Sequence, residues 1–124
     1  MNPRTMLTGL IAGRAAIGAL LVAKPQSQVG TGWIGDDAKR DSVAVAFRAV
    51  GARDMALALG TLATRRSGGP LKPWLLAATL ADATDLFATF AAGRAVPKSS
   101  KALIALLAGG AIVQQLALTR TVEA

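Results

Sequence analysis

The sequence predicts an all-α integral membrane protein, folded as an antiparallel bundle of four helices in a single domain over residues 1–124. Hydrophobic residues make up 52% of the chain and charged residues 17%, so a domain of this size lacks the polar residues that a water-facing surface needs. The apolar residues fall into four segments of 18 to 23 residues, the length at which a helix crosses ~30 Å of hydrocarbon. Most charges gather between these segments.

The first predicted span covers residues 6–23 and follows a basic residue, Arg4. An apolar run of this kind, ending in small and apolar residues up to Ala23, also occurs in cleaved signal peptides. Arg14 lies inside the run, whereas the core of a signal peptide is normally uncharged. We therefore interpret this segment as a membrane span.

The other predicted spans cover residues 42–64, 73–92 and 102–119. The last of them contains no charge, and its strongly polar residues are Gln114 and Gln115. The first three spans carry ionisable residues near their middles, so each alone could be a buried helix of a soluble bundle. Their common length and the connections between them favour membrane spans. The connections are charged and rich in helix breakers, at residues 24–41, 65–70 and 93–101.

Four spans place both ends of the chain on the same side of the membrane. That side would carry five basic residues: Arg4, Arg65, Arg66, Lys72 and Arg120. The other side would carry six: Lys24, Lys39, Arg40, Arg94, Lys98 and Lys101. The positive-inside rule does not orient a chain with this balance, and insertion in both orientations stays open.

The longest connection contains a segment, residues 30–37, that combines glycines with Trp33 and the adjacent carboxylates Asp36 and Asp37. Its spacing fits neither a phosphate-binding loop nor a calcium-binding loop. We interpret it as a re-entrant or surface turn, whose aspartates favour the start of the following helix. Trp33 and Trp74 lie near the starts of the second and third spans, where an indole ring anchors a helix at the membrane interface.

Residue types that are missing exclude several kinds of site. The chain has no Cys, His or Tyr, which excludes disulfides, thiolate or imidazole metal sites and Ser-His nucleophile systems. We expect no metal and no cofactor. The net charge is +7, but all except three of the 14 Lys and Arg residues lie at span ends or in connections, where they face anionic lipid. No nucleic-acid-binding motif appears, so we expect the lipid bilayer and not nucleic acid as a partner.

Six charged residues lie within the predicted spans, and their charges sum to zero. They are Arg14, Arg48, Arg53, Asp54, Asp82 and Asp85. An unpaired charge near a helix centre costs ~2.5 to 3.5 kcal/mol, so six unpaired charges would prevent insertion. Counting from the helix ends places five of them at a common depth. Arg48 is shallower, but its long side chain could run along the bundle toward the carboxylates. The sequence therefore predicts a buried ion-pair network.

Spacing within the helices indicates which partners the charged residues of this network could share. Asp82 and Asp85 are three residues apart, share one face of the third span and could converge on one partner. Arg48 and Arg53 point ~140° apart, so they address different neighbours. Glycines predict places where helix backbones approach closely: Gly9, Gly13, Gly18, Gly51, Gly60, Gly109 and Gly110. Such tight packing disfavours a channel.

Residues 47–60, FRAVGARDMALALG, together with Gly13-Arg14 and the ADATD run at 81–85, resemble a known family. This pattern is similar to small four-span membrane proteins grouped as domain of unknown function 4267, which are typical of actinobacteria, and more distantly to DoxX-like four-helix membrane proteins. The resemblance covers nearly the whole chain. It implies a multi-pass protein of the bacterial inner (plasma) membrane and brings no established activity.

Three functions are compatible with these features. In the favoured one, the chain is a membrane subunit or accessory factor with a membrane-protein partner or a second copy of itself, and the network only fixes helix register. In the second, it is an enzyme or binder acting on a lipid-like or isoprenoid ligand. Asp82 and Asp85 would form a catalytic acid–base pair, while Arg48 or Arg53 would hold an anionic headgroup. The third is a proton-coupled small transporter that uses the same carboxylates.

Overall fold

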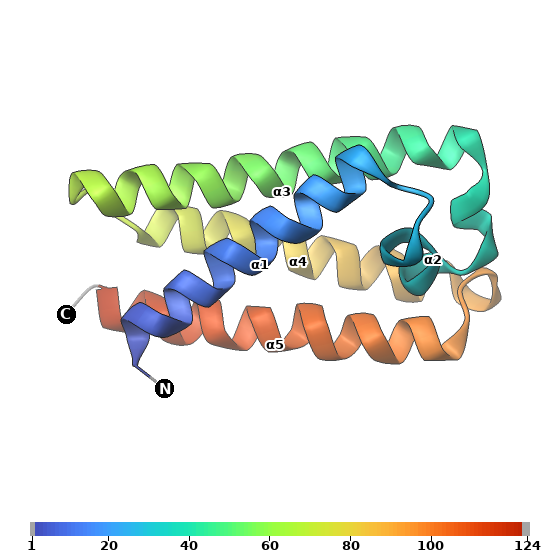
Figure 1. Ribbon diagram of the computed structural model, residues 1–124. Helices are drawn as coiled ribbons and strands as arrows, with labels where there is room; N and C mark the ends of the chain where they lie inside the picture. The colour runs from blue at the N-terminus through green and yellow to red at the C-terminus, as the bar shows by residue number, and fades with distance from the viewer. Residues whose placement is uncertain (1, 123–124) are drawn as a thin grey trace.

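The computed structural model describes residues 2–122 as a helical bundle (Figure 1). Its elements are α1 (Pro3–Ala23), α2 (Gln28–Ile34), the 3-10 helix η1 (Asp36–Lys39), α3 (Asp41–Ser67), α4 (Lys72–Ala91), the 3-10 helix η2 (Gly93–Ala95) and α5 (Lys98–Val122). This described part of the chain contains no strand. The all-helical prediction is confirmed.

Local sequence explains where the long helices begin and end. The Asn2 side chain accepts a hydrogen bond of 2.8 Å from the Arg4 amide, and Pro3 occupies the first turn of α1, where its missing N–H is not needed. Gly68 ends α3 in the left-handed conformation, at φ 72°. A residue without a Cβ adopts this conformation at little cost.

The prediction of four helices is wrong in its count, because the first connection contains a fifth α-helix. We expected a re-entrant or surface turn at residues 30–37, yet most of this segment belongs to the helix α2, which packs inward. Its apolar residues Val29, Trp33 and Ile34 pack against a buried cluster of Leu21, Ala38 and Phe47. Gly30 lies so close to the Pro25 carbonyl and the Phe47 ring that a side chain would not fit.

Three helices are long and apolar enough to cross a membrane. These are α1, α4 and α5, with mean hydropathies of 1.8, 1.2 and 1.8. The remaining long helix, α3, has 27 residues but also carries Arg48, Arg53 and Asp54. The structure thus supports a membrane protein. Helix α3 is not among the three apolar helices because of its charged residues.

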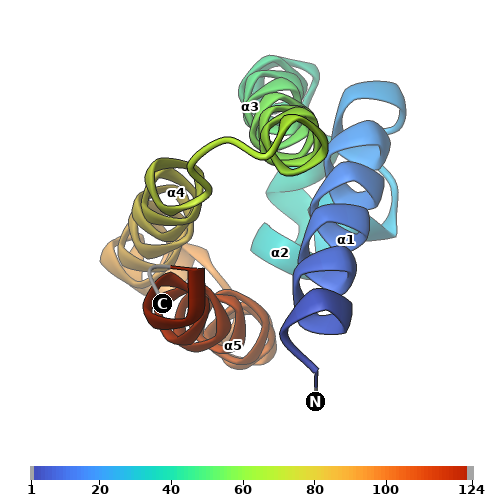
Figure 2. The same ribbon diagram turned by 90° about the vertical axis from the view of Figure 1, so that its left-hand side faces the viewer.

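The four long helices run antiparallel in sequence order and surround the axis of the bundle (Figures 1 and 2). The most extensive contacts join α1 to α3 and α4 to α5. Helix α1 runs obliquely, from beside α5 at its start to α3 at its end, and α2 lies near that end (Figure 1). Both ends of the described chain lie at the same end of the bundle, as predicted (Figure 1).

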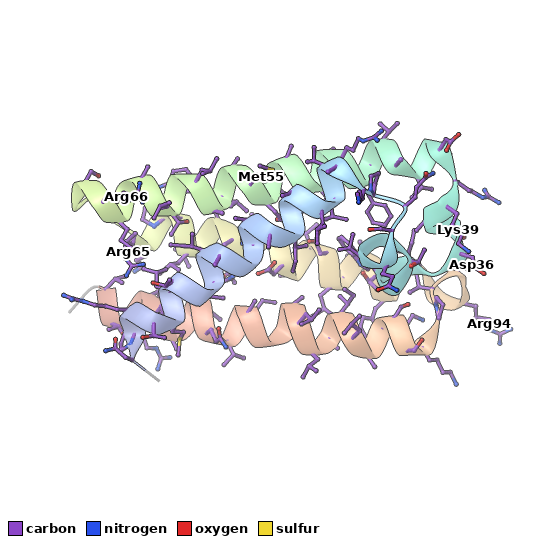
Figure 3. All side chains as sticks on the ribbon, in the orientation of Figure 1. Asp36, Lys39, Met55, Arg65, Arg66 and Arg94 are labelled. Atoms are coloured by element: carbon purple, nitrogen blue, oxygen red, sulfur yellow. The ribbon has the colours of Figure 1, made fainter. Side chains whose placement is uncertain are left out.

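Charged connections occupy the two ends of the molecule. Arg65 and Arg66 lie at one end, and Asp36, Lys39 and Arg94 lie at the other (Figure 3). Between these ends the outward faces are strongly apolar. The most exposed large hydrophobic residues are Phe87, Leu106, Val45, Leu80 and Val113, between 69% and 74% exposed.

The interior is unusually polar. Small apolar clusters fill the two ends, one around Leu7, Leu75 and Leu118 and the other around Leu21 and Phe47. Buried polar or charged residues are Asp54, Thr61, Asp82, Thr89, Ser100, Gln115 and Thr119. Apolar side chains outside and polar side chains inside are the arrangement that hydrocarbon favours and that water disfavours.

Candidate functional site

The crossing of α1 and α3 fixes the register of the first ion pair. A Cβ built on Gly51 would lie 2.6 Å from the Gly18 carbonyl oxygen, so the two backbones meet where neither helix has a side chain. One turn from this crossing, Arg14 faces Asp54. Its Nη1 donates to Asp54 Oδ1 at 2.9 Å, and its Nη2 donates to Asp82 Oδ2 on α4 at 2.6 Å.

Arg53 forms the second centre of the network. Its Nη1 and Nη2 donate to Asp85 Oδ1 and Oδ2 at 2.9 and 2.6 Å, in the two-pronged geometry that matches guanidinium to carboxylate. Its Nη2 also donates to Asp54 Oδ1 at 3.0 Å. Asp54 Oδ1 therefore lies between Arg14 and Arg53 and joins the two centres.

Helix α5 contributes a residue, Gln115, for which the sequence predicted no role. Gln115 is 1% exposed, and its Nε2 donates to Asp82 Oδ2 at 2.9 Å. Its Oε1 accepts a hydrogen bond of 2.9 Å from Thr79 Oγ1 on α4. The signal for this contact was the pair of glutamines in an apolar span, because an amide buried in an apolar segment needs a partner.

The expectation that Arg48 joins the network is wrong. Arg48 is exposed, and its Nε donates to the Val22 carbonyl at 3.1 Å. Val22 lies in the last turn of α1, where carbonyls lack partners within the helix and a cation is favoured by the helix dipole. The shallow position of Arg48 places these carbonyls within its reach, so the side chain need not extend to the carboxylates.

Asp82 and Asp85 share a face of α4 but do not converge on one partner. Asp82 pairs with Arg14, and Asp85 pairs with Arg53. The expectation that Arg48 and Arg53 address different neighbours is confirmed. We define the core cluster as Arg14, Arg53, Asp54, Asp82 and Asp85.

The core cluster keeps two carboxylate oxygens free. Asp54 Oδ2 and Asp82 Oδ1 accept no hydrogen bond from the described residues, whereas both oxygens of Asp85 are used. Fully buried side-chain polar atoms in this part of the chain all have partners, so the two free oxygens are reached by solvent-sized molecules. Both residues line a cavity.

This cavity has a volume of about 420 Å³. Its walls come from α1, α2 and α5, with Leu10, Ile17, Trp33, Leu103, Ile104 and Leu107 among the apolar lining residues. Its polar part is made by Arg14, Asp54, Asp82 and Asp85 of the core cluster. The arrangement can take a molecule with an apolar body and a small polar group.

Glycines at the cavity differ from those at the helix crossings. A Cβ built on Gly9 or Gly13, which line the cavity, meets nothing within 4 Å, and the same holds for Gly109 and Gly110. The expected close approach at these four positions is therefore wrong. Close approach of two backbones is found at Gly18 and Gly51, whereas the space beside Gly60 is filled by the ring of Trp74.

The two tryptophans do not occupy equivalent positions. The indole N–H of Trp33 donates to Thr89 Oγ1 at 2.9 Å, and its ring lies 5.6 Å from that of Phe47. Trp33 therefore ties α2 to α4 inside the bundle. No three acidic, His or Cys side chains among residues 2–122 are placed to hold a metal ion.

Comparison with known proteins finds no match: no family model, no curated protein and no solved structure is similar to this chain. The site must therefore be interpreted from its own geometry.

Proposed function

We propose that the protein is an integral membrane protein that binds an amphiphilic, lipid-like molecule in the cavity between α1, α2 and α5. The observation that carries this proposal is the cavity itself, which joins apolar walls to a charged interior surface. In this proposal all four long helices cross the bilayer. This function is the second of the three that the sequence allows, and the cavity is what favours it over a purely structural role.

The charges on α3 support a crossing path for this helix. Asp54 is 7% exposed, and Arg53 and Asp54 take part in ion pairs with α1 and α4. On the opposite face, Val45 and Leu59 are 71% and 59% exposed. Pairing Arg53 and Asp54 inside the bundle avoids most of the cost of placing these two charges in hydrocarbon. The exposed Arg48 lies two turns from the start of α3 and donates to the Val22 carbonyl.

The dimensions of the cavity support a small-molecule ligand. Binding sites for small molecules are commonly 300 to 1,000 Å³, mostly apolar, with a few polar groups that fix orientation. Helices α1 and α5 make far fewer contacts with each other than α1 makes with α3 or α5 makes with α4. An apolar molecule could therefore enter from the bilayer between α1 and α5.

An enzyme that uses Asp82 and Asp85 as an acid–base pair is less well supported. Each carboxylate is held by its own arginine, with the shortest contact at 2.6 Å in both cases. An arginine partner stabilises the ionised form of a carboxylate, whereas a general acid must hold a proton. The resemblance to domain of unknown function 4267, and with it the bacterial inner membrane, stays a prediction.

Purification from native membranes tests the proposal. We expect mass spectrometry to find a defined lipid-like molecule with the wild-type protein and with Gly110→Leu, but not with Gly13→Leu. Both substitutions place a side chain where a Cβ meets nothing, and only Gly13 lines the cavity. The same bound molecules in all three proteins would contradict the proposal. A stoichiometric partner protein without a bound small molecule would favour an accessory subunit.

A further inference from the structure

We propose that the polar group taken by this cavity is a protonated amine, so that the ligand is an amphiphilic ammonium ion. This inference rests on the proposed function, since it specifies the ligand of the same cavity. It follows from the charge balance of the core cluster and from the two carboxylate oxygens that have no partner.

The core cluster has an excess of negative charge. It contains two arginines and three aspartates, so the fully ionised cluster carries one net negative charge. Arg48, which would have balanced it, is exposed and donates to the Val22 carbonyl. The residues that extend the network, Gln115 and Thr79, are neutral. A single positive charge in the cavity would balance the cluster.

The two free oxygens belong to residues that line the cavity in which such a positive charge would lie. Asp54 and Asp82 are 7% and 8% exposed as whole residues, and each lines the cavity with one oxygen paired and one unpaired. These two oxygens are reached by solvent-sized molecules, so a ligand that displaces water from them must supply its own donors, and an N–H of an ammonium group would do so. An ammonium group has several N–H donors and no acceptor, which matches an acceptor-only site.

An anionic headgroup fits this surface poorly. Both terminal nitrogens of Arg14 donate to carboxylates, and those of Arg53 do the same. An anion would have to displace one carboxylate of the core cluster and would lie beside the other two. The expectation that Arg48 or Arg53 holds an anionic headgroup is therefore replaced by recognition of a cation through Asp54 and Asp82.

A matched series of ligands tests the inference at pH 7 in lipid nanodiscs. Decylammonium, decanol and decanoate share one apolar chain and differ in their polar group. Each would carry a bromine atom, which quenches tryptophan fluorescence on contact. Trp33 lines the cavity and Trp74 does not, so the Trp74→Phe protein reports binding through Trp33 alone. Gly13→Leu in the same background gives the quenching that comes from ligand dissolved in the bilayer.

Decylammonium should bind at least about tenfold more tightly than decanol or decanoate. Asp82→Asn should remove this preference, and Asp54→Asn provides a second variant if the first fails to assemble. Asp36→Asn is the matched control, because Asp36 has a side chain that is 95% exposed and lies at the end of the bundle. It should leave the preference unchanged.

Two results would distinguish failure of the ammonium inference from failure of the proposed binding function. Binding of decanol or decanoate as tight as that of decylammonium, still abolished by Gly13→Leu, would overturn the ammonium inference and leave the binding function intact. It would mean that the cluster is already neutral, with one carboxylate protonated. Quenching that is equal for all three ligands and unchanged in Gly13→Leu would overturn both the ammonium inference and the proposed binding function.

Discussion

Arg53 and Asp85 form the most completely paired contact of the core cluster. Two parallel hydrogen bonds of 2.9 and 2.6 Å join them, and the Asp85 side chain is 16% exposed. Removing Asp85 takes two hydrogen bonds from the Arg53 guanidinium and leaves it Asp54 as an acceptor, whereas removing both residues leaves neither member of the pair without its partner.

We therefore expect Asp85→Leu to lower the free energy of unfolding in detergent by about 3 kcal/mol. The double variant Arg53→Leu with Asp85→Leu should recover part of this loss, since Asp54 keeps Arg14 as a partner. Thermal melting of the four proteins of this cycle measures the coupling. Strictly additive losses would show that the contact contributes nothing specific.

Arg48, unlike Arg53, lies outside the core cluster. Arg48→Gln keeps a donor for the Val22 carbonyl and leaves the core cluster untouched, so the stability should change by no more than about 0.5 kcal/mol. Arg53→Gln leaves Asp85 without its cation and should destabilise strongly. Equal melting temperatures for the two variants would contradict the separation of Arg48 from the cluster.

The sequence identified the five residues of the core cluster through the cost of charge in hydrocarbon and a count of helix depth. It misplaced Arg48 because depth alone does not say which acceptor is nearest, and the end of α1 offered one. It left Gln115 without a role because an uncharged polar residue carries a much smaller penalty, and therefore a weaker signal, than an ion.

At the scale of the elements, α1 and α3 pack through two glycines. A Cβ on Gly18 would lie 2.8 Å from the Gly51 carbonyl oxygen, and a Cβ on Gly51 would lie 2.9 Å from Leu21 Cβ. The nearest neighbour at each position is a backbone carbonyl oxygen, which cannot move aside without shifting a helix.

Gly51→Ala should therefore destabilise the bundle by about 1 to 3 kcal/mol, the usual cost of overpacking. The control Gly110→Ala should be neutral or stabilising by up to about 1 kcal/mol, because alanine favours a helix and meets nothing at this position. Melting temperatures in detergent measure both. Destabilisation by Gly110→Ala equal to that by Gly51→Ala would argue against the crossing.

Glycine spacing in the sequence did not separate these two kinds of position. A glycine at a helix crossing and a glycine beside a cavity both lack a side chain, and only the placement of the neighbouring helix distinguishes them. The sequence likewise predicted the four long helices but not α2. Its seven residues are too few to show a periodic pattern, and the core against which Val29 and Trp33 pack forms only on folding.

At the scale of the whole molecule, the bundle consists of two helix pairs, α1 with α3 and α4 with α5. Ion pairs from Arg14 to Asp82 and from Arg53 to Asp85 join one pair to the other. In hydrocarbon, where apolar packing between helices brings little gain over lipid, these ion pairs would be a main cause of association between the pairs.

We propose that the core cluster lies inside the bilayer because α3 crosses it with the other long helices. The chain has no cysteine, so single cysteines can be introduced without a background signal. Lys39 and Arg66, the two positions for Lys39→Cys and Arg66→Cys, lie at opposite ends of the bundle (Figure 3); Lys39 comes just before α3, and Arg66 lies in its last turn. Neither residue belongs to the core cluster.

Labelling of these two variants with a membrane-impermeant maleimide, in sealed vesicles before and after permeabilisation, tests the claim most directly. If α3 spans the bilayer, one cysteine reacts in sealed vesicles and the other reacts only after permeabilisation. If the chain inserts in both orientations, each reacts in part, and a second label applied to the protected fraction shows them on opposite sides of every molecule. Reaction of both cysteines on the same side of each molecule would contradict the account, because the core cluster would then lie outside the membrane.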